Sequence, residues 1–354
     1  MKTGQISYNQ MQRCIRKPMK SGSGLLPGFV RYRGCAVLGE EQEGSCVSAI
    51  RSGGLDREGA MELLFARCEN ELLCQGAACG WVSASLTWPT ARTDEPTEIT
   101  ARLEALCQEA GAVLAQVFIT CSDAAVQPVL TLSAFGTMKY RVPAPKAGMA
   151  IAAVGHAGMA GAALLAAQAK DGLRARYSQG FLEQAEAFFK ERSLRGIAAV
   201  PAAFDSYLFP VGEGGVLAAL WYLADGAGIG FDLDLKRIPI RQETVEICEY
   251  YRANPYQLAG DGMALALTAS PERFVSGMEA VGIPAAVIGV ATGDKARILR
   301  NEDEVRYLDK PAQDELYRLD AAAETESAVC GKDWSNTHIK RMGGSDERKN
   351  FGNY

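Results

Sequence analysis

The chain has 354 residues, of which 48% are hydrophobic and 22% are charged, a composition that suits a globular protein of two ordinary domains. The formal net charge of -5 provides no overall positive field for nucleic acid. Residues 1–33 are a local exception with seven Lys and Arg and no acid; both a solvated face and a phosphate-facing edge explain them. Composition therefore disfavours nucleic acid as a partner.

Membrane and secretion signals are weak. No apolar segment follows the early basic residues as it does in a signal peptide. The weakly polar run 147–169 is rich in Gly and Ala and contains His156, which makes it a poor membrane span. We therefore expect a cytoplasmic protein without a membrane partner.

The ten cysteines form no Cys-x-x-Cys pair, and only His156 and His338 could add imidazole. This disfavours a structural zinc site and a histidine-based catalytic triad. Without a secretion signal, we expect reduced thiols that pack as small hydrophobic groups.

The N-terminal half predicts one α/β domain over residues 1–145. Its apolar periodicity alternates between helical and extended spacing, with Gly76 and Gly111 as helix stops. The expected elements are a helix over 57–75, a strand over 81–88, a helix over 98–110, and strands over 112–120 and 129–135. A linker-like segment, Pro143–Pro145, ends the domain.

The C-terminal half predicts a second α/β domain over residues 146–320. Ser178 and Ser270 are expected to cap helices with their hydroxyl groups. The expected elements are a strand over 150–154 and the helix after it, the helix after Ser178, a helix over 216–224, a strand over 229–235, a helix over 243–252, a strand over 263–267, the helix after Ser270, a strand over 285–290 and a hairpin over 296–307. Residues 321–354 lose apolar periodicity, and we expect a polar, mobile tail.

Three glycine-rich turns are candidate ligand sites: 155–161, 213–215 and 261–262. The first two open a helix in a way that could present backbone N–H groups to an anion, and Asp261–Gly262 begins a strand and could lie at the edge of a site. For 155–161, close packing of a Gly/Ala-rich helix explains the pattern equally well. Glu213 adds a carboxylate that suits a magnesium-bridged phosphate. We find no Walker phosphate loop and no Gly-x-Ser-x-Gly elbow.

Several of these segments, in this order, resemble the aminoimidazole ribonucleotide (AIR) synthase superfamily. The most specific stretch runs from Gly214 through Trp221 and Gly228–Gly230 to Ile238–Ile240, and then to 243–248 and 254–256. Asn70–Leu72 resembles the family's Asn-Asp-Leu helix, and Gly158–Gly161 its Gly-x-x-Gly-Thr turn. The resemblance covers about residues 1–319. It is strongest to the AIR synthase-related branch that includes the hydrogenase-maturation carbamoyl dehydratase.

The resemblance implies a two-domain α/β (α+β) fold. The N-terminal sheet would pair with a second copy across a homodimer, and the C-terminal domain would hold a mixed sheet with helices. It also implies ATP and magnesium in the cleft, held mainly by N-terminal carboxylates. The superfamily, which includes thiamine-monophosphate kinase and selenophosphate synthetase, uses ATP to activate an oxygen.

The sequence departs from this pattern at the expected magnesium ligands. The family's early Asp-Ala-Ala motif falls at Gly34–Ala36, beside Arg33, and its Gly-Gly-His-Thr-Glu segment at 116–120 keeps none of those residues. In the segment 209–215 the family's Asp becomes Pro210, while Glu213 remains. Magnesium needs several hard oxygen ligands, whereas a guanidinium binds phosphate without metal. Nucleotide binding could therefore persist without metal-dependent transfer.

These patterns define a candidate site in the interdomain cleft, with Glu71 and Glu213 as candidate metal ligands. The candidate ligand-binding residues are Arg33, Asn70, Glu71, Gly158, Gly161, Glu213, Gly214, Gly215 and Gly262. The leading hypothesis is a degenerate family member that binds a nucleotide or another small phosphorylated ligand with little or no ATP turnover. Two alternatives remain: an active ATP-dependent dehydratase or kinase-type enzyme with a remodelled metal site, and a non-catalytic scaffold partner.

Overall fold

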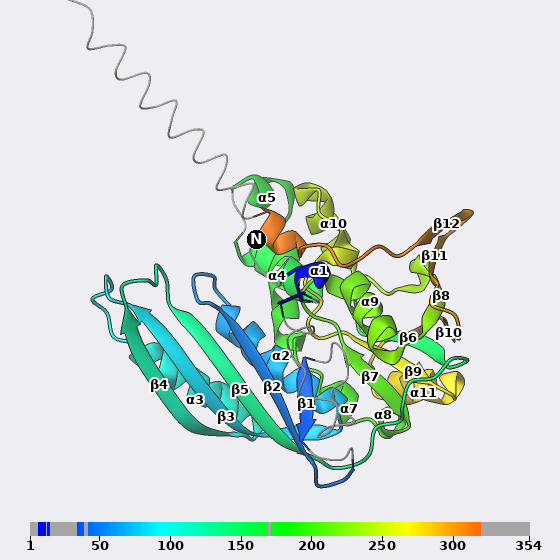
Figure 1. Ribbon diagram of the computed structural model, residues 1–354. Helices are drawn as coiled ribbons and strands as arrows, with labels where there is room; N and C mark the ends of the chain where they lie inside the picture. The colour runs from blue at the N-terminus through cyan, green and yellow to red at the C-terminus, as the bar shows by residue number, and fades with distance from the viewer. Residues whose placement is uncertain (1–5, 12, 15–33, 39–41, 169–170, 320–354) are drawn as a thin grey trace, which may run out of the picture.

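The computed structural model describes residues 6–11, 13–14, 34–38, 42–168 and 171–319. Arg33 and the expected tail at 321–354 lie outside the described residues. The described chain forms two domains, each built on its own sheet, with the segment 139–149 connecting them (Figure 1).

The N-terminal domain is a five-stranded mixed sheet with two helices on one face (Figure 1). The strand order is β1-β2-β5-β3-β4, and only β3 and β4 run parallel. Its elements are β1 (Cys35–Leu38), β2 (Cys46–Gly54), α2 (Ala60–Cys74), β3 (Ala77–Pro89), α3 (Thr97–Ala110), β4 (Val113–Ser122) and β5 (Val129–Met138).

Alternation along the strands explains why the helices cover one face of this sheet. Alternate residues of β3 and β5 are buried and pack with apolar residues of α2 and α3, because successive strand side chains point to opposite faces. Fully buried members of this core include Leu72, Leu86, Leu103, Leu106, Leu130 and Leu132.

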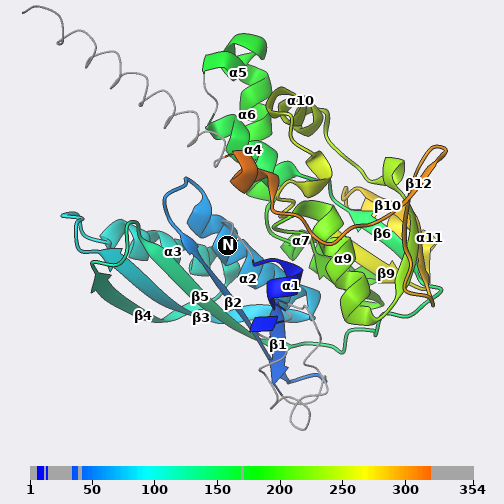
Figure 2. The same cartoon turned by 45° about the horizontal axis from the view of Figure 1, so that its top comes forward.

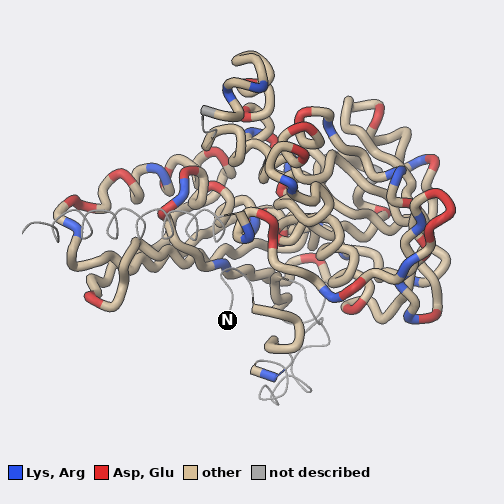
Figure 3. Tube along the Cα trace, turned by 90° about the horizontal axis from the view of Figure 1, so that it is seen from above, with Lys and Arg blue, Asp and Glu red and all other residues tan. Residues whose placement is uncertain are grey.

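The other face of the sheet is nearly free of charge. Arg51 is the single charged residue in the five strands, and most charged residues gather elsewhere (Figure 3). The strand register places Ile50, Trp81, Phe118 and Phe135 on the face away from the helices, among Ser and Thr side chains. Ile50 is 62% exposed and Phe118 61% exposed, so large apolar side chains lie uncovered there.

The C-terminal domain is a seven-stranded mixed sheet in the order β12-β11-β8-β10-β6-β9-β7. Only β8 and β11 pair in parallel. The strands are β6 (Ala150–Val154), β7 (Ser206–Pro210), β8 (Gly230–Asp234), β9 (Ala264–Thr268), β10 (Ala285–Thr292), β11 (Arg297–Asn301) and β12 (Glu304–Tyr307). Its helices are α4 (Met159–Ala167), α5 (Asp171–Arg176), α6 (Gln179–Ala187), α7 (Arg195–Ala198), α8 (Pro201–Phe204), α9 (Gly215–Ala227), α10 (Gln242–Tyr251) and α11 (Pro271–Glu279).

Both faces of this second sheet are covered. One core joins the sheet to α9, and another joins its opposite face to α7, α8 and α11. All five residues of β9 are buried, which explains its continuous apolar sequence. Short 3-10 turns at Phe188–Glu191, Leu235–Arg237 and Pro255–Gln257 complete the domain.

The chain's described N-terminal segment packs against α9 (Figure 2). The short helix α1 (Tyr8–Met11) places the Tyr8 ring 5.9 Å from the Trp221 ring, edge to face. Lys310, from the segment after β12, donates to Asn9 at 3.1 Å. The N-terminal segment and the segment after β12 therefore contact each other beside α9.

Most expected helices and strands are present, with boundaries shifted by a few residues. The Ser178 hydroxyl accepts from the N–H of Phe181, as expected of a helix cap. The expected Ser270 cap is wrong, because its side chain makes no cap bond and its N–H instead donates to the Thr268 hydroxyl. The strands β1, β2 and β7 were not expected. None of the helices in the described residues combines the length and apolar character of a membrane span.

The nine cysteines that lie in the described residues are all free. Burial raises the pKa of Cys68, Cys79 and Cys248 to about 12 and that of Cys107 to about 11. Thiols with such raised pKa values are poor nucleophiles at neutral pH, in keeping with packing as small hydrophobic groups.

Candidate ligand-binding site between the domains

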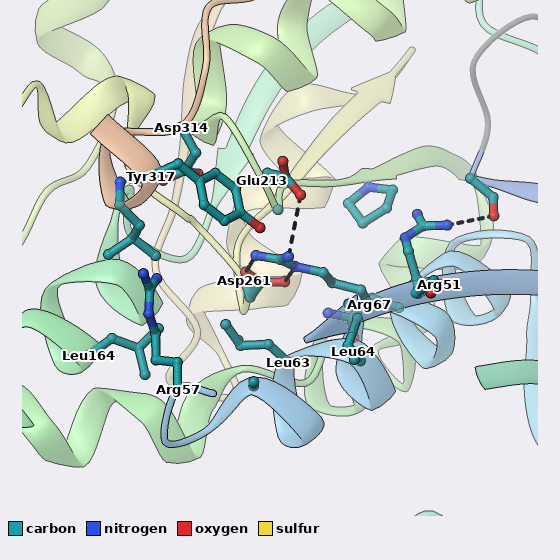
Figure 4. A pocket seen from close by; sticks show the side chains of 18 of the residues that line it. Arg51, Arg57, Leu63, Leu64, Arg67, Leu164, Glu213, Asp261, Asp314 and Tyr317 are labelled. Carbon is teal, nitrogen blue, oxygen red and sulfur yellow. Dashed lines mark hydrogen bonds and ion pairs between the residues drawn. The ribbon is translucent and has the colours of Figure 1, made fainter. Parts of the chain in front are cut away.

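A cavity of about 1050 Å³ lies between the two domains. We call it the interdomain cavity (Figure 4). Its N-terminal wall comes from β2 and α2, and its C-terminal wall from α4, the segment after β7 and the chain near residue 314. Charged residues of both signs line it: Arg51, Asp56, Arg57, Glu58, Arg67, Glu71, Glu213, Asp261 and Asp314.

Arg67 of α2 joins the two domains inside this cavity. Its Nε donates to Asp261 Oδ1 at 2.9 Å, and its Nη2 donates to Asp261 Oδ2 at 3.0 Å. Its Nη1 lies 3.6 Å from Glu213 Oε2, so the guanidinium lies between two carboxylates (Figure 4). Burial by itself would lower the pKa of Arg67, but the charge and hydrogen bonds of Asp261 outweigh burial and raise it. Arg67 is therefore a fixed internal cation.

A second ion pair fills the N-terminal side of the cavity. Arg51 Nη2 donates to Glu71 Oε1 at 2.7 Å, and its Nη1 donates to the carbonyl oxygens of Gly34 and Ile50 at 2.9 Å. A Cβ on Gly34 would lie 2.0 Å from Arg51 Nη2 and 2.1 Å from Glu71 Oε1. Any side chain at position 34 would displace this pair. Gly34 is the position at which the sequence resemblance predicts a missing aspartate, and a guanidinium from β2 lies beside it.

The carboxylate of Asp314 closes the cavity at the beginning of α9. Its Oδ2 accepts from the N–H of Gly214 at 2.6 Å, and its Oδ1 accepts from the N–H of Leu316 at 2.9 Å. Burial raises the pKa of Asp314 to about 6, against the opposing effect of these two hydrogen bonds. The first free N–H at this helix end, a typical anion position, is therefore already bonded within the chain.

Asn70 lines the cavity but is used as a structural link. Its Nδ2 donates to the carbonyl oxygen of Arg192, and its Oδ1 accepts from the N–H of Leu194, both at 2.9 Å. Asn70 is 1% exposed, so its two polar atoms hold the C-terminal domain against α2.

The candidate glycines lie in tightly packed turns and helix starts rather than on the cavity wall. A Cβ on Gly161 would lie 2.4 Å from Leu258, and one on Gly158 would lie 2.9 Å from the Pro255 carbonyl oxygen. Gly215 and Gly262 have positive φ angles of 66° and 96° and similarly close backbone neighbours. Close packing accounts for these four glycines, and Gly214 N–H is bonded to Asp314.

The described residues do not fit a magnesium ion in this arrangement. The candidate ligands Glu71 and Glu213 line one cavity, as the sequence suggested, but each lies against an arginine. No group of three or more His, Cys, Asp and Glu side chains in the described part of the chain is placed to hold a metal. Magnesium needs several hard oxygen ligands in near-octahedral geometry, so we derive no chemical step through it.

Sequence reasoning did not single out three residues that shape this cavity: Arg51, Arg67 and Asp314. Arg67 and Asp261 are 194 positions apart, and a single arginine on an amphipathic helix resembles a solvated one. Asp261 was expected at the edge of a site, and it does line the cavity.

Residues 146–300 match the family described as AIR synthase related protein, C-terminal domain. This match shows that the C-terminal domain is related to the AIR synthase family. No curated protein matches the chain.

Solved structures of the same fold include HypE and ThiL proteins. E. coli HypE, described as a hydrogenase maturation protein, is 16% identical with a TM-score of 0.59 and covers 75% of this chain and 86% of its own. A HypE in complex with ATP is 15% identical with a TM-score of 0.59 and covers 89% and 98%. AaThiL complexed with AMPPCP and TMP is 15% identical with a TM-score of 0.62 and covers 85% and 96%. At these identities the likeness shows the fold.

Proposed function

We propose that this protein binds a nucleotide or another phosphorylated small molecule in the interdomain cavity, with little or no ATP turnover. One observation carries the proposal: the carboxylates Glu71 and Glu213, expected as metal ligands, each face an arginine of the same chain. An internal guanidinium supplies the positive charge that a metal would otherwise provide. The fold's neighbours include proteins with ATP or with AMPPCP and TMP bound.

The cavity has room and donors for such a ligand. Its volume of about 1050 Å³ is at the upper end for small-molecule sites. Arg51 uses three N–H groups on Glu71 and two carbonyl oxygens, and a guanidinium has five. Two donors of Arg51 are therefore left for a phosphate oxygen, and a phosphate would compete with Glu71 for the third.

The variant Glu71→Gln distinguishes nucleotide binding without turnover from metal-dependent catalysis. Under our proposal, removing this charge releases Arg51, and affinity for ATP rises by about threefold to tenfold, with or without magnesium. The measurement is calorimetric titration of ATP into the full chain, with phosphate release followed in parallel. Glu104→Gln, an exposed carboxylate of α3, is the matched control and leaves affinity unchanged.

A remodelled metal site is the second candidate, because Glu71 and Glu213 line the same cavity. It predicts robust magnesium-dependent phosphate release by the wild type and its loss in Glu71→Gln. That result would overturn our proposal. Absence of ATP binding in every variant would favour the non-catalytic scaffold instead.

We also propose a homodimer that covers the uncharged face of the N-terminal sheet, and a cytoplasmic location. Ile50, Trp81 and Phe118 lie uncovered on that face, and exposed apolar patches mark interaction sites. Free cysteines suit a reducing compartment. Trp81→Glu should convert a dimer to a monomer in light scattering after size exclusion, whereas Val281→Glu, an exposed apolar residue of the other domain, should not. A wild-type monomer at all concentrations would contradict the dimer.

A further inference from the structure

A second cavity of about 290 Å³ lies between the domains. We call it the arginine pocket. One wall comes from α2 and α3, and the other from residues 190–195, the last of which begins α7. Its lining residues are Phe65, Ala66, Glu69, Arg102, Leu106, Glu109, Lys190, Arg192, Ser193 and Arg195.

Two of the four cations in the arginine pocket are already paired. Arg195 Nε donates to Glu69 Oε1 at 2.5 Å, and the Ser193 hydroxyl donates to Glu69 Oε2 at 2.9 Å. Arg102 Nε donates to Glu62 at 2.8 Å. Glu69 and Glu62 are therefore neutralised by their partners.

Lys190 and Arg192 have no carboxylate within ion-pair distance in the part of the chain that the structure describes. Glu109, an exposed carboxylate of the pocket, is the remaining negative group on its wall. The two cations thus exceed it by one charge. This imbalance between fixed groups favours an anion from outside the chain.

Arg192 is partly buried although no carboxylate among the described residues pairs with it. Its Nη1 donates to the Phe189 carbonyl oxygen at 3.0 Å, and its guanidinium lies 5.1 Å from the centre of the Phe189 ring. Burial lowers the pKa of Arg192, with a smaller contribution from the charges of Arg102 and Arg195, against the raising effect of Glu62 and Glu109. Buried charges are normally paired, so this guanidinium is poised for a ligand.

The backbone that carries Arg192 is held in place from two sides. Asn70 bonds the carbonyl oxygen of Arg192 and the N–H of Leu194. Gly262 packs so closely that a Cβ there would lie 2.2 Å from the Glu191 carbonyl oxygen. Such preorganisation reduces the entropy cost of binding.

We infer that the arginine pocket binds a small oxyanion of the phosphate type, free or as the phosphate group of a small molecule. Arg192 provides a planar pair of donors and Lys190 a second charge. The buried side chains of Phe65 and Leu106 form apolar wall on the side of α2 and α3. The volume suits a phosphate with a short substituent and is at the small end for ligand sites.

The test titrates the full chain calorimetrically with inorganic phosphate and, separately, with glycerol phosphate at constant ionic strength. We expect saturable binding, weakened about tenfold or more in Arg192→Gln and about threefold in Lys190→Gln. Arg273→Gln, a 72% exposed side chain outside both cavities, should bind as the wild type does. Tighter binding of glycerol phosphate identifies a phosphorylated small molecule, and equal or weaker binding identifies free phosphate.

Two results would overturn the inference. One is the absence of saturable binding of both probes by the wild type. The other is binding that Arg192→Gln leaves unchanged while Arg51→Gln removes it, which would assign the phosphate to the interdomain cavity. Because the two variants change different cavities, this inference and the proposed function can fail independently.

Discussion

Two arginines at the domain boundary have opposite surroundings. Arg67 is held by both oxygens of Asp261 and lies near Glu213, whereas Arg192 has one backbone acceptor and an aromatic ring but no carboxylate in the described residues. The charge of Arg67 is thus balanced by acids of the same chain, whereas the charge of Arg192 is not balanced by any acid of the described residues. A buried cation therefore indicates a structural link when its partners are present, and a ligand site when they are missing.

The largest expected effect comes from breaking the complete site. Arg67→Met leaves the Asp261 carboxylate, whose side chain is 0% exposed, without a counter-charge. We expect a loss of about 3–5 kcal/mol in the free energy of unfolding, measured by denaturant titration. Arg92→Gln breaks an exposed ion pair with Asp94 and should change the free energy of unfolding far less, because solvent screens surface ion pairs. Equal effects of the two substitutions would remove the distinction between structural and surface arginines.

The next largest effect is expected in the loop at Asp261–Gly262, which bonds Arg67 and packs against Arg192. Gly262 follows Asp261 and packs on Glu191 and Arg192, at a φ of 96°. Gly262→Ala combines backbone strain with a steric clash and should cost about 2–4 kcal/mol. Gly282→Ala has a similar φ of 76° and no neighbour within 4 Å, so its smaller loss in thermal unfolding measures strain alone. If the two variants unfold at the same temperature, the packing argument fails.

A pH-dependent effect follows from Asp314. Burial raises its pKa to about 6 in the folded protein, well above the ordinary value of an aspartate, so the folded state holds this proton more tightly than the unfolded one. The contribution is fully present below about pH 4 and is lost as pH rises through 6, on the order of 1–3 kcal/mol. Unfolding of the wild type and Asp314→Asn at several pH values should show a difference that changes across this window. A constant difference would mean that Asp314 titrates normally.

The smallest effect is expected at the incomplete site. Arg192→Gln removes a hydrogen bond and a ring contact but no ion pair between described residues. It also removes the desolvation cost of a partly buried charge. Without phosphate, the free energy of unfolding should change by less than about 1 kcal/mol in either direction. A loss of several kcal/mol would place Arg192 in the same class as Arg67.

The sequence was informative where local periodicity is strong. The long helices α2 and α3 and the buried strands β6 and β9 lie near their expected positions. The strands β1, β2 and β7 were not predicted from the sequence. β1 has only four residues, β2 is rich in Ser and Gly, and β7 includes a proline. Such segments have little intrinsic strand preference and form through pairing with distant strands.

The candidate site was predicted in part, because motifs report residue types but not their partners. The sequence drew attention to Asn70, Glu71 and Glu213, which do line one cavity. It could not show that Arg51 and Arg67 would neutralise these acids, because the partners lie on other elements. The expected cation beside the lost aspartate was Arg33, outside the described residues, whereas the structure places Arg51 there.

One helix serves both cavities. Glu69 of α2 lines the arginine pocket, while its neighbours Asn70 and Glu71 line the interdomain cavity. With 3.6 residues per turn, one added residue would rotate everything beyond it by about 100°. A single insertion before Glu69 would therefore move acids and amides out of both cavities at once. Evolution can vary either cavity by substitution, but the length of α2 is fixed by the two together.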